Sequence, residues 1–153
     1  MHRRDAEAPR ENQLTKLVIG FAIEVHRVPG PGLLEWAYEE CLCYELALQG
    51  LPFARQTPLP VVYKGVTLDC GYRIDLLVDG LVIVELKAVE SLSPIYEAHL
   101  LTYLKLAGKR VGLLINFNVP TLKQGLKRIV NQFPDSFASQ RLCGEVSDAP
   151  ALS

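Results

Sequence analysis

Two carboxylates and a lysine lie within two sequence stretches that are largely apolar. Asp75 occurs in YRIDLLV, and Glu85 and Lys87 occur in IVELKAV. Burying two carboxylates and an ammonium in such strands is costly unless they pair with one another or bind a cation. Two carboxylates suit a hard cation such as Mg²⁺, and a lysine beside them can stabilise negative charge that develops on a substrate. An internal ion-pair network, or charges at strand ends that reach water, would account for the same pattern without chemistry.

The turn between the two stretches decides whether these residues meet. Side chains alternate along a strand, so Glu85 and Lys87 emerge on one face. A plain two-residue Asp-Gly turn would place Asp75 opposite Val84, and Glu85 would then face the other way. We therefore predict a turn with an odd number of residues or a bulge, for example a three-residue loop, which brings Asp75 and Glu85 to the same face.

The remaining elements must position this pair of strands. Apolar periodicity and turn signals predict an α/β fold with a mixed central β-sheet flanked by helices, in the order ααβββ(β)αβα. The expected elements are a helix with apolar face Leu14 to Val25, a helix over 33–48, a hairpin turning at Lys64-Gly65, the Asp75–Glu85 hairpin, a helix over 94–106, a buried strand in VGLLINF and a last helix opened by a capping box at 121–124.

Composition places the chain among single-domain globular proteins. It has 153 residues, of which 49% are hydrophobic and 22% charged. We expect a domain over 13–133 between flexible tails, 1–12 and 134–153. The longest uncharged stretch, 111–122, is too short to span a membrane, and the polar start predicts no signal peptide, so a cytoplasmic location is expected. An iron–sulfur or redox protein would need clustered cysteines, whereas Cys41 and Cys43 point to different sides of a helix.

The overall charge of the chain gives no indication of nucleic-acid binding. The formal net charge is -1. However, residues 98–134 contain no Asp or Glu and carry six basic side chains, Lys105, Lys109, Arg110, Lys123, Lys127 and Arg128. This stretch predicts either a local phosphate-binding face or ordinary solvated surfaces.

Two motifs give the chain a family resemblance. Asp75, nine further residues and then Glu85-Leu86-Lys87 resemble the D-xn-(D/E)-x-K signature of the PD-(D/E)XK nuclease superfamily. The segment Gly32-Leu-Leu-Glu35-Trp-Ala-Tyr38, with phrases such as LVDGLVIVELKAVE and GLLINFNVP, is similar to the GxxExxY protein family, a branch of that superfamily. The resemblance covers about residues 14–133 and implies a restriction-endonuclease-like core.

The resemblance also implies roles for individual residues. Asp75 and Glu85 would bind Mg²⁺ or Mn²⁺ together with the Leu86 carbonyl, and Lys87 would lie beside the scissile phosphate. Glu35 matches an acidic residue that the superfamily often carries on its first core helix near the metal, although an acidic residue is favoured at a helix N-terminus in any case.

A second helix is implied to contribute to the same site. His99 and Tyr103 lie four residues apart, where an exonuclease-like branch has Q-x-x-x-Y, so His99 replaces the glutamine. An imidazole can still donate a hydrogen bond to a phosphate or a water. The alternative is a structural or solvent-exposed histidine, which is the usual role of a lone histidine on a helix. Tyr38 is expected to pack in the core.

The implied function is metal-dependent hydrolysis of nucleic-acid phosphodiester bonds, with DNA expected over RNA and no membrane partner. A homodimer is expected because a small domain that cuts both strands of a duplex usually needs two active sites. The alternative is a catalytically silent nucleic-acid-binding or assembly module that retains the fold.

Overall fold

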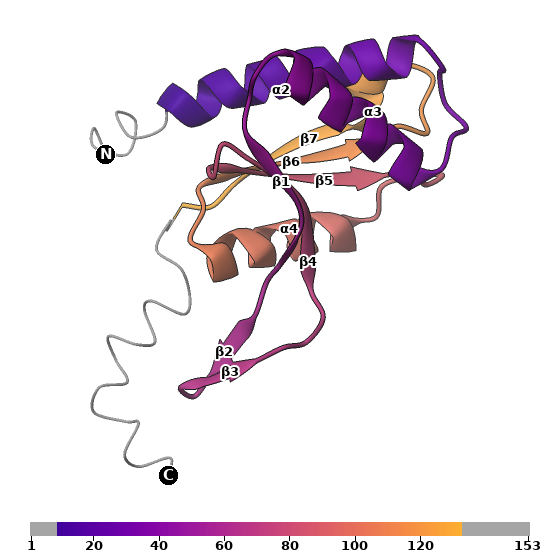
Figure 1. The fold of residues 1–153 in the computed structure, drawn as a ribbon. Helices are drawn as coiled ribbons and strands as arrows, with labels where there is room; N and C mark the ends of the chain where they lie inside the picture. The colour runs from indigo at the N-terminus through magenta and orange to yellow at the C-terminus, as the bar shows by residue number, and fades with distance from the viewer. Residues whose placement is uncertain (1–8, 133–153) are drawn as a thin grey trace.

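A five-stranded mixed sheet forms the centre of the computed structural model, which describes residues 9–132 (Figure 1). The pair β5–β6 is parallel, and the other neighbouring strands are antiparallel. The strand order across the sheet is β1 (Phe53–Pro58), β4 (Arg73–Val78), β5 (Val82–Lys87), β6 (Val111–Asn116) and β7 (Leu126–Val130).

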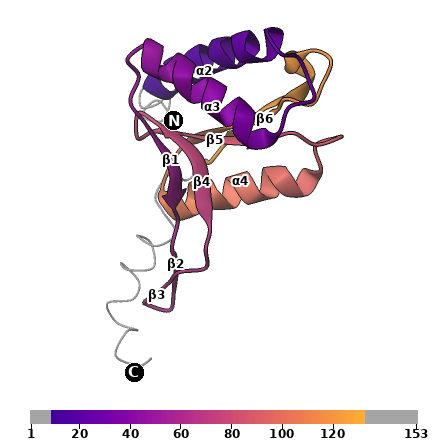
Figure 2. The same ribbon diagram turned by 45° about the vertical axis from the view of Figure 1, so that its right-hand side comes forward.

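Helices cover both faces of this sheet. Helices α2 (Pro9–Arg27) and α3 (Glu35–Leu48) lie on one face, and α4 (Pro94–Ala107) lies on the other (Figures 1 and 2). Two apolar clusters follow from this layering: one includes side chains of α2 and α3, and the other includes Leu100 and Leu104 of α4. The expected α/β class with a mixed central sheet flanked by helices is confirmed.

Strand β5 is apolar almost throughout because it is covered on both faces. Val84 and Leu86 belong to the cluster under α2 and α3, whereas Ile83 belongs to the cluster under α4. Helix α4 matches its predicted extent and ends at Gly108, whose φ of 70° is the left-handed conformation that glycine adopts at little cost.

A small hairpin projects from the body of the protein. Strands β2 (Val61–Tyr63) and β3 (Val66–Leu68) pair antiparallel and extend away from the layers (Figures 1 and 2). The predicted turn at Lys64-Gly65 is confirmed, since both residues have positive φ, 51° and 79°.

The prediction of a last helix was wrong. A 3₁₀ turn, η1 (Leu122–Gly125), leads instead into β7, which pairs with β6. The Thr121 side chain makes no capping hydrogen bond. Leu126 and Ile129 face opposite apolar clusters, so their i, i+3 spacing, which suggested one helical face, serves a strand with two covered faces.

Two further boundaries differ from expectation. Strand β1 is not among the expected elements, and its terminal Pro58, which has no backbone N–H to donate, is tolerated because β1 is an edge strand. Helix α2 begins at Pro9, so residues 9–12 are helical and do not belong to a tail. The predicted C-terminal tail, 134–153, lies outside the described residues. No helix in the described part of the chain is long and apolar enough to cross a membrane.

Gly125 provides a test of the β6–η1–β7 connection. A Cβ at this position would lie 2.1 Å from the Asn116 carbonyl oxygen, so the backbone must move to accept any side chain. We expect Gly125→Ala to lower the free energy of unfolding by about 3 kcal/mol, as measured by urea denaturation. Gly20→Ala is the control: it lies in an exposed helix position with no atom within 4 Å of the new Cβ, and a stabilisation of up to ~1 kcal/mol is expected. Equal midpoints for wild type and Gly125→Ala would contradict this packing.

Candidate active site

The site forms where two neighbouring strands part. The turn between β4 and β5 has three residues, because Val78 pairs with Val82, and this confirms the predicted odd-numbered turn. The paired residues end at Leu76 and Val84, although β5 continues to Lys87. We call the opening beyond this last pair the fork. Extending the register by one residue places Asp75 opposite Glu85 at the fork.

The two carboxylates replace the missing strand pairing. The backbone N–H of Asp75 donates to Glu85 Oε2 at 3.0 Å, and the backbone N–H of Leu86 donates to Asp75 Oδ2 at 2.9 Å. Each carboxylate therefore satisfies a backbone donor of the opposite strand, and the two side chains are brought together at the fork. Glu85 is buried and Asp75 is half-buried.

Burial and mutual repulsion disfavour ionisation of this pair. Burial, followed by the charge of Asp75, raises the pKa of Glu85 to about 8. Burial likewise raises the pKa of Asp75, although the Leu86 N–H, the Gln56 amide and the Lys87 charge oppose that shift. A positively charged ligand would relieve the repulsion between two ionised carboxylates.

Helix α4 completes one side of the site. A small cavity of about 40 Å³ is lined by Glu85 and Lys87 of β5 together with Tyr96, His99 and Tyr103 of α4, among others. The predicted residues His99 and Tyr103 thus share a cavity with the carboxylate and the lysine, although His99 remains exposed overall. Burial, and then the charge of Glu85, raises the pKa of Tyr103, so its hydroxyl stays protonated and can donate.

Hydrogen bonds fix the backbone around Lys87. Its Nζ lies 4.6 Å from the centre of the Tyr96 ring, a cation–π contact that sequence analysis missed. The carbonyl of Lys87 accepts from the N–H of Phe117, and the buried Asn116 side chain binds both backbone polar groups of Val89. The lysine is therefore fixed at its backbone, while its ammonium rests on an aromatic ring.

Helix α3 brings acidic residues from the other layer. The first turn of α3 lies near the end of β5 (Figures 1 and 2). Partial burial, and then the charge of Asp75, raises the pKa of Glu35, and Lys87 opposes this shift. Glu35 therefore lies within the electrostatic reach of Asp75 and Lys87. Glu39, one helical turn further on, is buried and was missed, although its i+4 spacing from Glu35 could have indicated it.

The Gly-x-x-Glu-x-x-Tyr segment is explained by the loop before α3. Gly32 has a φ of 109°, which a residue with a side chain rarely adopts. Tyr38 is fully buried as expected, and its hydroxyl donates to the Gly30 carbonyl at 2.6 Å and accepts from the Leu33 N–H at 3.1 Å. Its ring stacks on Phe117 at 4.4 Å. Tyr38 thus fixes the loop that delivers Glu35.

The donor set fits a hard divalent cation that keeps part of its water shell. Within residues 9–132, no three Asp, Glu, His or Cys side chains come together as a ligand group. Mg²⁺ usually binds through one or two carboxylates and retains several waters, so the Asp75–Glu85 pair is a sufficient side-chain set. A zinc-type centre would need more nitrogen or sulfur ligands than the described part of the chain offers here.

Several basic side chains of residues 98–134 contact other residues of the chain. Arg110 pairs with Glu11 at 3.3 Å, Lys127 pairs with Glu97 at 3.8 Å, and Arg128 bonds to Asn12. Intramolecular partners therefore engage part of the positive charge that this stretch could present to phosphate.

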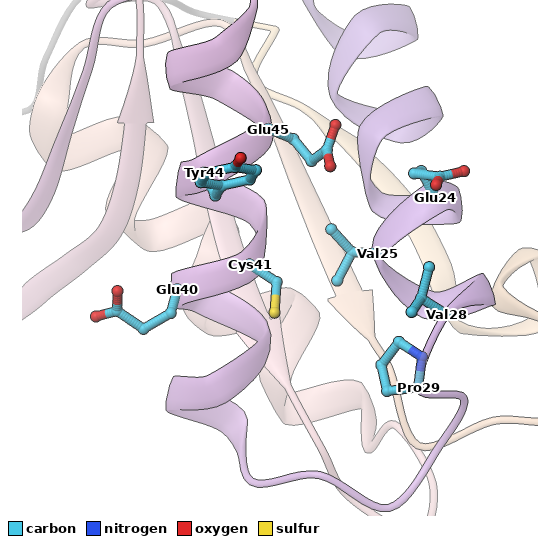
Figure 3. Close-up of a pocket in the computed structure, with 8 residues that line it drawn as sticks. All are labelled: Glu24, Val25, Val28, Pro29, Glu40, Cys41, Tyr44 and Glu45. Carbon is cyan, nitrogen blue, oxygen red and sulfur yellow. The ribbon is translucent and has the colours of Figure 1, made fainter.

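An apolar groove lies apart from these residues. It runs between α2 and α3, has a volume of about 330 Å³ and contains none of the predicted site residues (Figure 3). Three glutamates, Glu24, Glu40 and Glu45, line it alongside Val25 and Tyr44. Its carboxylates do not converge as Asp75 and Glu85 do, and Glu24 and Glu40 are engaged by arginines.

The raised pKa of Glu85 predicts a pH dependence of stability in the metal-free protein. Between about pH 4.5 and 8 the folded state binds more protons than the unfolded state, so the Glu85 contribution to stability falls as pH rises through this window. Glu85→Gln removes this penalty. In EDTA, we expect its free energy of unfolding, measured by urea denaturation, to be close to that of wild type at pH 5 and higher at pH 8, by an amount on the order of a few kcal/mol. A difference that does not change with pH would contradict this assignment.

One protein-family model matches most of the chain. The family model described as the PD-(D/E)XK nuclease superfamily matches residues 12–129, which include the fork and the residues of α3 and α4 around it. No curated protein and no solved structure gave a significant match. With most of its length matched by the family model, the chain belongs to the PD-(D/E)XK nuclease superfamily.

Proposed function

We propose that this protein is a metal-dependent nuclease whose active site is the fork between β4 and β5. The observation that carries the proposal is the pairing of Asp75 with Glu85 at the fork, with Lys87 on the same strand lining the same cavity as Glu85. Both carboxylates have raised pKa values, which is expected of a site whose charge is completed by a bound cation.

Asp75, Glu85 and the Leu86 carbonyl are the proposed ligands of Mg²⁺ or Mn²⁺. When bound, such an ion polarises a phosphate oxygen and lowers the pKa of a coordinated water. Lys87 supplies fixed positive charge where negative charge develops on the phosphate. Because its ammonium rests on Tyr96, it needs little reorganisation to do so.

The neighbouring polar residues have supporting roles in this proposal. Glu35 on α3 lies within the electrostatic reach of Asp75 and Lys87, and it can orient water near the ion. His99 and Tyr103 line the cavity beside Glu85, where each can donate a hydrogen bond to a phosphate oxygen or a water. These roles follow from the position of each residue together with its donor or acceptor chemistry.

We further propose that the chain represents the GxxExxY branch, acts on DNA in preference to RNA and works as a homodimer when it cuts duplexes. The roles of Gly32, Glu35 and Tyr38 support the branch assignment. The glycine has a positive φ, the glutamate lies near the site, and the tyrosine hydroxyl binds the loop before α3. The dimer would supply the second site that cleavage of both strands requires.

One feature favours a catalytically silent module instead. Both carboxylates already serve as acceptors for backbone donors, so the fork is a satisfied structural element without a metal. In such a module Lys87 would act as a counter-charge to the two acids. Truncating it would then destabilise the fold by about 3 kcal/mol.

Cleavage assays on purified variants separate these two functions. Wild-type protein is incubated with single- and double-stranded DNA and RNA in Mg²⁺, Mn²⁺ or EDTA. We expect metal-dependent cleavage that falls at least ~10²-fold in Glu85→Gln, which loses ligand charge, and in Lys87→Ala, which loses the charge beside the phosphate. Metal binding should weaken in Glu85→Gln and persist in Lys87→Ala.

Glu45→Gln is the matched control, since it removes a carboxylate from the groove between α2 and α3 and should cleave as wild type does. Urea midpoints of all variants are measured in parallel. A wild-type protein that cuts none of the four substrates, together with a Lys87→Ala variant that unfolds, would reject the nuclease proposal in favour of the silent module.

A further inference from the structure

Gln56 has an unusual backbone conformation for its place in the fold. Its φ is 48°, in the left-handed region that disfavours residues with a side chain. The other non-glycine residues with positive φ in the described chain, Lys64 and Asp79, lie in hairpin turns that require it. Gln56 lies instead inside β1, between Arg55, which pairs with Leu76, and Thr57, which pairs with Ile74.

This conformation aims the Gln56 amide at the fork. Gln56 Nε2 donates to Asp75 Oδ1 at 3.4 Å and to Glu39 Oε1 at 3.0 Å. A carboxamide nitrogen carries two hydrogens, so one group can serve both contacts. The amide nitrogen faces both acids, because it is the donor of the carboxamide and the two side-chain oxygens are the acceptors.

Asp75 is consequently held through both of its oxygens. Oδ2 accepts the Leu86 N–H at 2.9 Å, while Oδ1 accepts the Gln56 amide. Two contacts on different oxygens define the orientation of a carboxylate, whereas one alone leaves it free to rotate. A ligand carboxylate that is already oriented loses less conformational freedom when it binds an ion.

Glu39 anchors the other end of the amide. It is buried, and its second oxygen accepts from Arg55 Nε at 3.0 Å. Arg55 also donates to Glu40 at 2.7 Å, so two residues of α3 hold it in place. The Gln56 amide therefore connects Glu39 on α3, which Arg55 holds in place, with Asp75 at the fork.

From these contacts we infer that Gln56 is a positioning residue that orients Asp75 for metal binding, and that its strained backbone is retained for this purpose. The inference rests on the proposed metal site at the fork. Strain that persists inside a strand fits a functional constraint, because a glycine at this position would remove it. Gln56 could not be identified from the sequence, since nothing in FARQTP marks a left-handed residue.

Gln56→Gly tests the inference, because it relieves the backbone and removes the amide together. We expect its thermal midpoint to be at or slightly above that of wild type, while its Mn²⁺ affinity, measured by electron paramagnetic resonance of free Mn²⁺, falls at least ~10-fold. Gln56→Asn keeps an amide and tolerates the left-handed region, but it is one methylene too short to bridge both acids. Its Mn²⁺ affinity should fall similarly.

Lys64→Gly is the control, since it relieves a φ of 51° in the β2–β3 turn and should leave Mn²⁺ affinity unchanged. A clear fall in the thermal midpoint of Gln56→Gly with wild-type Mn²⁺ affinity would make Gln56 a structural residue and overturn the inference. Wild-type protein that binds no Mn²⁺ would instead reject the proposed metal site itself, so the two failures are distinguishable.

Discussion

The end of the β4–β5 pairing is the constraint on which the rest of the site depends. Two backbone N–H groups, those of Asp75 and Leu86, find their acceptors in side-chain carboxylates of the opposite strand. An unsatisfied donor at this depth would be costly, so the acids are held in place by the hydrogen-bonding needs of the fold itself. The same arrangement buries two acids side by side: burial raises both pKa values, and the charge of Asp75 adds to the upward shift of Glu85. Structure and chemistry are thus coupled: the groups that close the fork are those that can bind a cation.

A fork in the sheet also lets both helical layers reach one place. In a continuous sheet the residues of α3 and α4 would be separated by the sheet itself. Here Glu35 lies within electrostatic reach of Asp75 from one layer, and Tyr96, His99 and Tyr103 of α4 line a cavity with Glu85 from the other. The Tyr38 hydroxyl binds α3 to the loop that precedes it, and the buried leucines of α4 pack that helix into the apolar cluster on its side of the sheet. The site therefore combines acidic groups on one side with aromatic and imidazole groups on the other.

The sequence predicted correctly the features that follow from backbone geometry or from the spacing of apolar residues. The Asp75–Glu85 register followed from side-chain alternation and turn parity, and the buried character of β5 followed from its nearly continuous apolar run. The approach of His99 and Tyr103 to Glu85 was expected only through the resemblance. The sequence was misleading where the same spacing of apolar residues fits both a helix and a strand. In β7, Leu126 and Ile129 could share one face of a helix, but they lie on the two opposite faces of a strand. It was silent where tertiary contacts override local preference, as at Gln56, whose backbone is set by what its side chain must touch.

The central claim is that Asp75 and Glu85 hold a divalent cation at the fork, and a crystal structure of the protein grown with Mn²⁺ tests it most directly. Anomalous scattering locates manganese independently of the surrounding model. The account predicts an anomalous peak within bonding distance of both carboxylates and the Leu86 carbonyl, and the loss of that peak in Glu85→Gln crystals. Manganese at full occupancy elsewhere, with the Asp75–Glu85 pair still bonded only to backbone N–H groups, would contradict it.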